Sequence, residues 1–196
     1  MAFFFAIFGC GRGNHINDEK AEVKIEHYKF ARTSHKWGDF GSILTHGMIE
    51  SEIGAVNVCL RRVGPYVPDL SLPSPSFVVV TDMMKGKIEA SGLSGATFAR
   101  VEKAHIVNFD WMKAGLELSE PPFFPPNGEP AGYLLHFGHS PETAKLMPDL
   151  WCLICTGHST SKDFYLVDGR IRISRKAVRF FEDIKSKEIE IHPVDC

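Results

Sequence analysis

The sequence has almost no excess charge of either sign. It contains 22 Lys and Arg residues and 24 Asp and Glu residues, which gives a net charge of −2 at pH 7. The pI is about 6.5. Proteins that bind nucleic acid without sequence preference neutralise its phosphates with an excess of Lys and Arg. The composition therefore argues against a nucleic-acid-binding protein.

Cysteine is scarce and long apolar runs are missing. The five Cys are an odd number at irregular spacings, which argues against a disulfide framework and favours a reducing, cytoplasmic location. The apolar run Ala2–Phe8 is short and no Lys or Arg precedes it, so it predicts a first β-strand ending at Gly9 rather than a secretory signal. No later run is long enough to span a bilayer, and we expect no membrane partner.

The sequence also lacks the common catalytic motifs. No HExxH, GxSxG, P-loop or GxGxxG run occurs. The glycine-rich stretch Gly9–Gly13 lacks the second half of a phosphate-binding pattern and is typical of a hairpin turn. Asp and Glu are spread evenly, so spacing alone nominates no carboxylate pair for acid–base catalysis. We predict that the chain is not an enzyme and has no catalytic residues.

One cysteine pair has the spacing of a metal site. Cys152 and Cys155 form a CxxC within WCLICTGH, and His158 follows three residues later. Two thiolates and an imidazole at this spacing can hold zinc, with Cys59 or Cys196 as a fourth ligand. The apolar flanks are equally typical of a buried strand in which Cys packs as a small apolar residue. We expect no cofactor, with zinc at Cys152, Cys155 and His158 as the alternative and a redox pair as a weaker one.

The nine His residues are scattered, and His136 and His139 form the closest pair. The alternation in Gly132–Phe137 predicts a short strand there. Alternation would place the two imidazoles on opposite faces, which argues against a metal that they share.

The most informative pattern is a block that occurs twice. The first block, Phe77–Val101, aligns without a gap on the second block, Arg170–Val194, when Thr81 is laid on Ser174. Each block is a β-branched run, a hydroxyl residue, a helical stretch and a second apolar–polar alternation. Duplication and shared patterning without common origin both stay open. A repeat of folding units that carries no catalytic motif favours a binding surface.

Capping residues and alternation predict the elements of both blocks. Thr81 and Ser174 should cap helices, the first ending at Gly92. The other expected elements are strands at 20–30, 54–62, 97–101 and 187–194, and helices starting at Ser140 and covering Arg175–Ser186. The proline-rich stretches Pro65–Pro75 and Pro121–Pro130 are expected to be loops.

These elements predict an α+β fold with mixed or antiparallel sheets, few helices and two similar strand–helix–strand units at 77–101 and 170–194. We divide the chain into a mainly-β segment, 1–64, and an α+β region, 65–196, which contains both units. The two parts are expected to form one compact domain or two closely packed lobes.

The blocks resemble the immunity proteins encoded beside bacterial polymorphic toxins, and the nearest group is the double-CxxCG-motif family of myxobacteria. The matching residues are Val80-Thr81, Ala90–Gly95, Phe98, Val101, Ile173-Ser174, His192-Pro193-Val194 and the HKWG stretch that ends at Gly38. The chain departs from that family because no CxxCG follows Trp37, and Cys155 precedes Thr156 rather than Gly. The resemblance therefore does not by itself imply bound zinc here.

The resemblance implies a bacterial, cytoplasmic protein that binds and neutralises a cognate toxin without catalysis, as in toxin–antitoxin pairs. Aromatic residues often anchor protein interfaces. The candidates for partner binding are Trp37, Trp111, Phe123, Phe124 and Trp151. The alternatives are a small metal-binding or enzymatic domain that uses Cys152, Cys155 and His158, and a structural or adaptor domain without a toxin partner.

Overall fold

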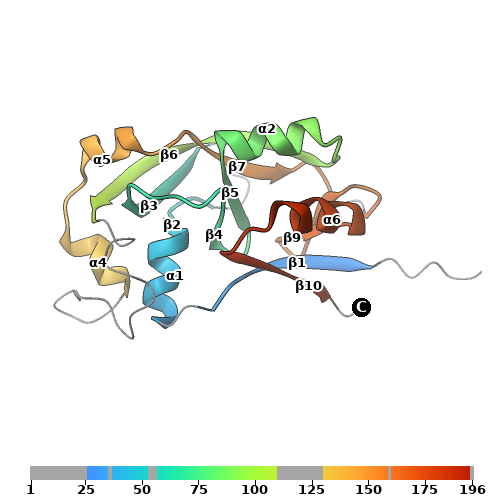
Figure 1. The fold of residues 1–196 in the computed structure, drawn as a ribbon, viewed down its shortest axis with the longest axis horizontal. Helices are drawn as coiled ribbons and strands as arrows, with labels where there is room; N and C mark the ends of the chain where they lie inside the picture. The colour runs from blue at the N-terminus through green and yellow to red at the C-terminus, as the bar shows by residue number, and fades with distance from the viewer. Residues whose placement is uncertain (1–25, 35–36, 53–56, 110–129, 159, 195–196) are drawn as a thin grey trace, which may run out of the picture.

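The computed structural model describes residues 26–34, 37–52, 57–109, 130–158 and 160–194 (Figure 1). These residues form two β-sheets with a few short helices, so the predicted α+β class with mixed and antiparallel sheets is confirmed. The predicted N-terminal strand and residues 121–129 of the expected Pro121–Pro130 loop lie outside the described residues, and Pro130 itself begins a helix. None of the helices in the described ranges is both long and apolar enough to cross a membrane.

The smaller sheet is antiparallel and has the strand order β10-β1-β9-β8. Its strands are β1 (His27–Arg32), β8 (Phe164–Val167), β9 (Arg170–Ile173) and β10 (Ile189–Val194). Helix α6 (Arg175–Ile184) connects β9 to β10. Figure 1 shows β1 lying between these two strands, so an early segment of the chain completes the sheet of the second block.

The larger sheet is mixed, has the order β2-β3-β6-β7-β5-β4 and forms a nearly closed barrel. Its strands are β2 (Met48–Ile49), β3 (Val58–Gly64), β4 (Leu70–Ser74), β5 (Phe77–Thr81), β6 (Ala96–Asn108) and β7 (Leu150–Cys155). Only β3 and β6 pair in parallel within this sheet. The helices are α1 (Gly38–His46), α2 (Asp82–Ala90), α4 (Pro130–His136) and α5 (Pro141–Leu146).

The two sequence blocks have the same topology. Together with the strand that precedes it, each block forms a hairpin, a helix and a returning strand, namely β4–β5–α2–β6 and β8–β9–α6–β10. In each case a strand from elsewhere in the chain, β7 or β1, lies between the two strands that flank the helix. The predicted pair of strand–helix–strand units is therefore present, and each is a βαβ crossover split by one antiparallel strand.

The local contacts at the helix starts also match. The hydroxyls of Thr81 and Ser174 accept hydrogen bonds from Met84 N (3.3 Å) and Ala177 N (3.2 Å). Each capping residue also donates its backbone N–H to the carbonyl of an aspartate that precedes the hairpin, Asp69 (3.1 Å) or Asp163 (3.0 Å). The same aspartates accept the capping hydroxyls through their carboxylates, at 3.2 and 2.7 Å. The blocks thus share a specific hydrogen-bond arrangement as well as an order of elements.

The helix ends differ in one informative way. Gly92 and Lys185 follow α2 and α6 at equivalent alignment positions, and both have positive φ, +68° and +54°. Glycine adopts this left-handed conformation at no steric cost, whereas a residue with a Cβ is strained by about 1 kcal/mol.

Replacing Lys185 by Gly is therefore expected to raise the free energy of unfolding by about 0.5–1 kcal/mol, because it relieves this strain. Urea denaturation of the variant measures the change. Lys187→Gly is the matched control, since Lys187 is also exposed and has no positive φ. A Lys185→Gly variant no more stable than this control would contradict the prediction.

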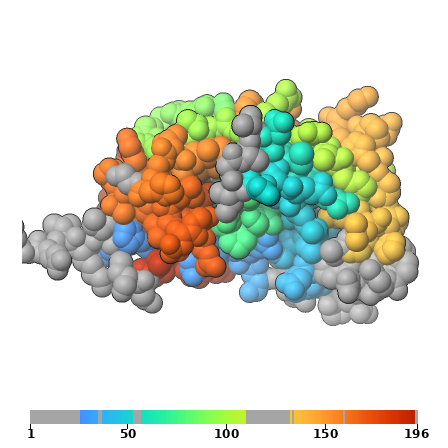
Figure 2. Space-filling model, turned by 180° about the vertical axis from the view of Figure 1, so that it is seen from behind, coloured from blue at the N-terminus to red at the C-terminus, as the bar shows by residue number. Residues whose placement is uncertain are grey.

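Apolar side chains form a core shared by both units. Met84 and Ile88 of α2 and Val178 and Phe181 of α6 belong to one cluster that also takes in strands of both sheets. A second cluster fills the space around β3, β5 and β7, and a third, which includes Trp37 and Phe40, packs α1 and α4 against β3 and β6. In the space-filling view from behind, the β7–β9 region (orange) lies to the left of the β2–β3 region (teal) on the same face of the molecule (Figure 2).

Two local predictions were wrong. Pro65–Pro75 is not wholly a loop, because β4 runs through Pro73. β4 is the edge strand of the sheet, and its register shifts between Ser71 and Ser74. Proline has no N–H to donate, and it is tolerated in strands at such edges and irregularities. Gly132–Phe137 is not a strand, because residues 132–136 belong to α4. This helix begins at Pro130, and proline is common at the first position of helices.

Candidate protein-interaction face

Trp151 of β7 lies at the centre of a partly exposed face on the larger sheet. β7 runs between β5 and β6, with Trp151 opposite Arg100 and Leu153 opposite Phe98 in the β6 register. Side chains alternate along a strand, so Trp151 and Leu153 point to one face and Cys152 to the other. Leu153 is buried under α2 and α6, whereas Trp151 is only half-buried.

Helix α2 holds the indole in place from one side. The indole N–H donates to Asp82 Oδ1 at 3.0 Å. The Lys85 ammonium lies 4.7 Å from the centroid of the Trp151 ring and 5.8 Å from that of Phe98. Lys85 also pairs with Glu89 one turn later at 3.0 Å. Cation–π contacts of this kind contribute about 0.5–1 kcal/mol at exposed sites. The hydrogen bond and the cation–π contact together fix the position of the indole against α2.

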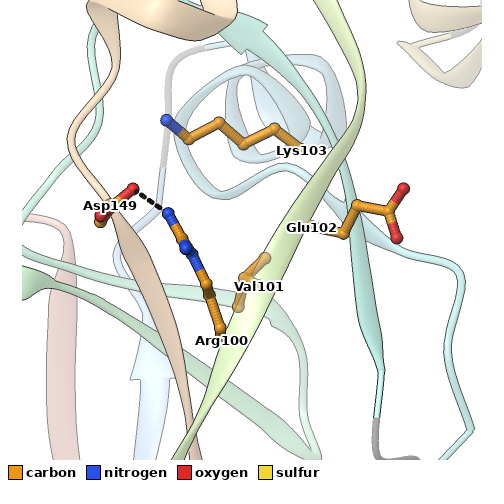
Figure 3. Close-up of a pocket in the computed structure, with 5 residues that line it drawn as sticks. All are labelled: Arg100, Val101, Glu102, Lys103 and Asp149. Carbon is orange, nitrogen blue, oxygen red and sulfur yellow. Dashed lines mark hydrogen bonds and ion pairs between the residues drawn. The ribbon is translucent and has the colours of Figure 1, made fainter.

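A hollow of about 390 Å³ lies along β6 beside this face, lined by Arg100, Val101, Glu102, Lys103 and Asp149. Figure 3 shows Arg100 and Asp149 pointing toward one another across the hollow while Glu102 points away. The guanidinium and the carboxylate are 3.0 Å apart, and both side chains are more than half exposed, at 69% and 52%. An ion pair this exposed contributes little to stability and leaves both charges accessible to a partner.

Lys103 has a structural role in the same hollow. Its ammonium donates to the carbonyls of Ala144 (2.9 Å) and Met147 (2.8 Å) at the end of α5, where helix carbonyls lack internal partners. Burial lowers the pKa of Lys103, an effect that Asp149 opposes. Two of its three N–H donors are therefore used by the backbone at the end of α5. We call Lys85, Phe98, Arg100 and Trp151, with the adjoining hollow, the Trp151 face.

The proposed metal ligands lie in different surroundings. Cys152 is buried in the second core cluster, and Cys155 packs against the first cluster, as expected for residues three apart on a strand. Burial raises the pKa of each thiol to about 12, which opposes the thiolate form that zinc requires. His158 is exposed, and its Nδ1 is 3.2 Å from the Leu166 carbonyl. Within the described ranges, no group of three or more His, Cys, Asp or Glu residues is arranged to hold a metal ion.

The predicted partner-binding aromatics fall into three groups. Trp37 is only 8% exposed and packs edge-on against Phe40 in the third cluster, so the fold uses it in the core. Trp111, Phe123 and Phe124 lie outside the described residues. Trp151 is the one that the described structure places at the surface, together with neighbours that the sequence did not single out.

The two histidines considered as a pair also have separate roles. His136 ends α4 and is exposed. His139 lies after the helix, and its Nδ1 accepts a hydrogen bond from Ile106 N at 2.9 Å. The prediction of opposite strand faces rested on a strand that does not exist, and the imidazole of His139 instead fixes the end of β6.

One buried charge was missed by the sequence reasoning. Arg62 of β3 has no exposed surface, and its guanidinium donates to the carbonyls of Thr45 and Tyr66. Burial lowers the pKa of Arg62 to about 9. The alternation of β3 could have indicated this burial. Arg62 lies between Leu60 and Gly64 on the side of the strand that faces inward. Arg62 therefore links β3 to the end of α1.

No protein-family model matches this chain, and no curated protein matches it with significant similarity. The interpretation of the Trp151 face therefore depends on its own geometry. That geometry combines a fixed indole, a second aromatic ring and an accessible guanidinium, which are the residue types enriched at the energetic centres of protein interfaces.

Proposed function

We propose that this chain is a non-enzymatic immunity protein that binds and neutralises a cognate bacterial toxin. The Trp151 face is the observation that supports the proposal most directly, because it offers a preorganised aromatic and cationic surface. Rigid anchors reduce the entropy lost on binding. The resemblance to immunity proteins was based on the strand–helix–strand order of the two blocks, and the described structure has the same order.

The surroundings of the other candidate residues support the same proposal. The Cys152 and Cys155 thiols are held in their protonated forms by burial. Lys103 and Arg62 donate to backbone carbonyls. These groups stabilise the fold, which leaves surface recognition as the property that the described residues serve best.

The proposal predicts a toxin gene next to the gene of this chain, and the test uses the toxin that it encodes. Trp151→Ala is expected to weaken toxin binding by at least about 30-fold, which corresponds to the loss of about 2 kcal/mol at an interface centre. Arg100→Glu should weaken it by about tenfold or more, since a repulsive charge replaces an exposed anchor. Affinity is measured by calorimetry, and growth of cells that co-express toxin and variant reports neutralisation.

Arg179→Glu is the matched control for Arg100→Glu, because Arg179 is exposed on α6 and forms part of the other unit. It makes the same charge change away from the Trp151 face and should leave binding intact. Folding of Trp151→Ala is checked by circular dichroism, since the indole is half-buried. If both variants bind toxin as tightly as the unchanged chain, this face is not the interface. If the unchanged chain neither binds nor protects, the proposed function is wrong.

A further inference from the structure

The smaller sheet contains an opening between two of its strands. β1 pairs with β10 over all six of its residues, from His27 opposite Val194 to Arg32 opposite Ile189. On its other side, β1 pairs with β9 only at Tyr28 opposite Ile173. The antiparallel ladder would otherwise continue to Phe30 and Ile171. The two strands therefore separate beyond the first pair, although both belong to one sheet.

A hollow of about 180 Å³ occupies this opening. Leu72 and Val78 of the β4–β5 hairpin are buried and close its inner end. Phe30 and Ile171 contribute apolar walls from the two separated strands. The volume accommodates one or two side chains, and the walls suit their methylene groups.

Three cationic side chains line the outside of this hollow: Lys29 from β1, and Arg170 and Arg172 from β9. Because Ile171 and Ile173 are buried, alternation places Arg170 and Arg172 on the opposite, outer face of the sheet. The same rule places Lys29 on that face, since Tyr28 points inward. We call this arrangement the basic hollow.

The three cations have no carboxylate partner among the described residues. No ion pair joins Lys29, Arg170 or Arg172 to an acid, and the one hydrogen bond of Arg172 goes to the Ile171 carbonyl at 3.4 Å. The nearby acids have other roles or remain apart. Glu190 pairs with His192 at 2.9 Å, and Asp168 in the β8–β9 turn makes no ion pair with either arginine.

This concentration of positive charge contrasts with the whole chain, which carries a net charge of −2. Unpaired cations beside one another repel, and a sheet face gains nothing in stability from them. A guanidinium presents a planar fork that matches a carboxylate, and two of them beside an apolar hollow favour a carboxylate on a methylene stem.

We propose that the basic hollow docks an acidic segment of the protein partner, with a glutamate or aspartate side chain entering between β1 and β9. This inference rests on the proposed function, since it names the chemistry of the surface that the toxin presents. The hollow belongs to the smaller sheet, so it is a second contact region beside the Trp151 face of the larger one. The net charge disfavours nucleic acid as the occupant, because phosphate neutralisation usually involves a large excess of Lys and Arg.

The first experiment uses a fluorescent hexaglutamate peptide and the purified chain. We expect binding that weakens as salt is added, because charge pairs at a surface are screened. The double variant Arg170→Glu/Arg172→Glu should weaken peptide binding by at least about tenfold, equivalent to about 1.4 kcal/mol. Arg179→Glu/Lys187→Glu is the matched control, since it reverses two exposed cations elsewhere and should leave binding unchanged.

Equal loss in the two double variants would show a general charge effect and overturn the site, as would the absence of hexaglutamate binding. Tighter binding of a single-stranded oligonucleotide than of hexaglutamate would also overturn it. In the toxin assay, full protection by Arg170→Glu/Arg172→Glu would reject the basic hollow and leave the proposed function standing. Failure of the unchanged chain to protect would reject the proposed function, and the peptide assay would still decide the chemistry of the hollow.

Discussion

Replacing Gly95 by Ala is expected to lower the free energy of unfolding by roughly 3–5 kcal/mol. Gly95 has a φ of +91°, and a Cβ built on it would lie 2.2 Å from the Phe164 carbonyl oxygen and 2.7 Å from the Lys162 Cβ. The first obstacle is backbone, so it cannot rotate away. Relief would require separating the loop after α2 from the start of β8, and that contact joins the two units.

Gly92→Ala is the matched control for this prediction. Gly92 also has positive φ, at +68°, but a Cβ there meets nothing within 4 Å. Its cost is the left-handed conformation alone, about 1 kcal/mol. Urea denaturation of both variants separates backbone strain from steric exclusion. Equal losses of stability in the two variants would mean that the approach of Gly95 to Phe164 is unimportant.

Asp163→Asn is expected to lower the free energy of unfolding by about 2–4 kcal/mol near neutral pH. One carboxylate oxygen accepts from the Ser174 hydroxyl at 2.7 Å, and the other accepts from Ser94 N at 2.8 Å and Ser94 Oγ at 2.9 Å. An amide replaces one acceptor with a donor, so at least one of these donors loses its partner. Asp69→Asn is the control, because Asp69 accepts only the Thr81 hydroxyl among the side-chain bonds of the described residues. It should cost about 0.5–1.5 kcal/mol.

The loss at Asp163 should depend on pH. Burial opposes the charged form, but the hydrogen bonds from Ser174 and Ser94 outweigh it, so the pKa of Asp163 lies below its usual 3.8. A lowered pKa in the folded state stabilises the protein above the unfolded value, and this stabilisation is lost as pH falls through the folded value. The stability difference between the unchanged chain and Asp163→Asn should therefore narrow below about pH 4. A difference that stays constant on acidification would contradict this assignment.

Much of the fold could be predicted because its signals are local. Thr81 and Ser174 are capping residues in sequence and in structure, and the alternation of Ile189 and Ile191 gives β10. Where tertiary context decides, prediction failed. Pro73 looks like a strand breaker, yet β4 tolerates it at an edge where Arg32 donates to the carbonyls of Leu72 and Pro73. The short stretch before His136 fits a strand pattern, but packing of Leu134 beside α1 selects a helix.

The candidate site could be predicted only in part. Residue type made Trp151 one candidate among several aromatics, and neither Lys85 nor Phe98 could be grouped with it, because the position of α2 over β6 and β7 brings them together. The basic hollow has no sequence signal at all. Lys29 and Arg170 are far apart in the chain, and their proximity depends on the insertion of β1 beside β9. Ser94 and Gly95, which contact the start of the second unit, do lie in a stretch that the sequence singled out, because Ala90–Gly95 is among the residues of the family resemblance.

The insertion of β1 between β9 and β10 has a consequence for synthesis. A ribosome makes β1 before all of the larger sheet, but the neighbours of β1 follow only after β7. Pairings between such distant segments form slowly. During translation, both edges of β1 therefore stay without their native partners until β9 and β10 have been made. In that period the edges are open to pairing with other strands. The basic hollow forms only when β9 has emerged, so a growing chain that already contains Trp151 would still lack the proposed second contact region.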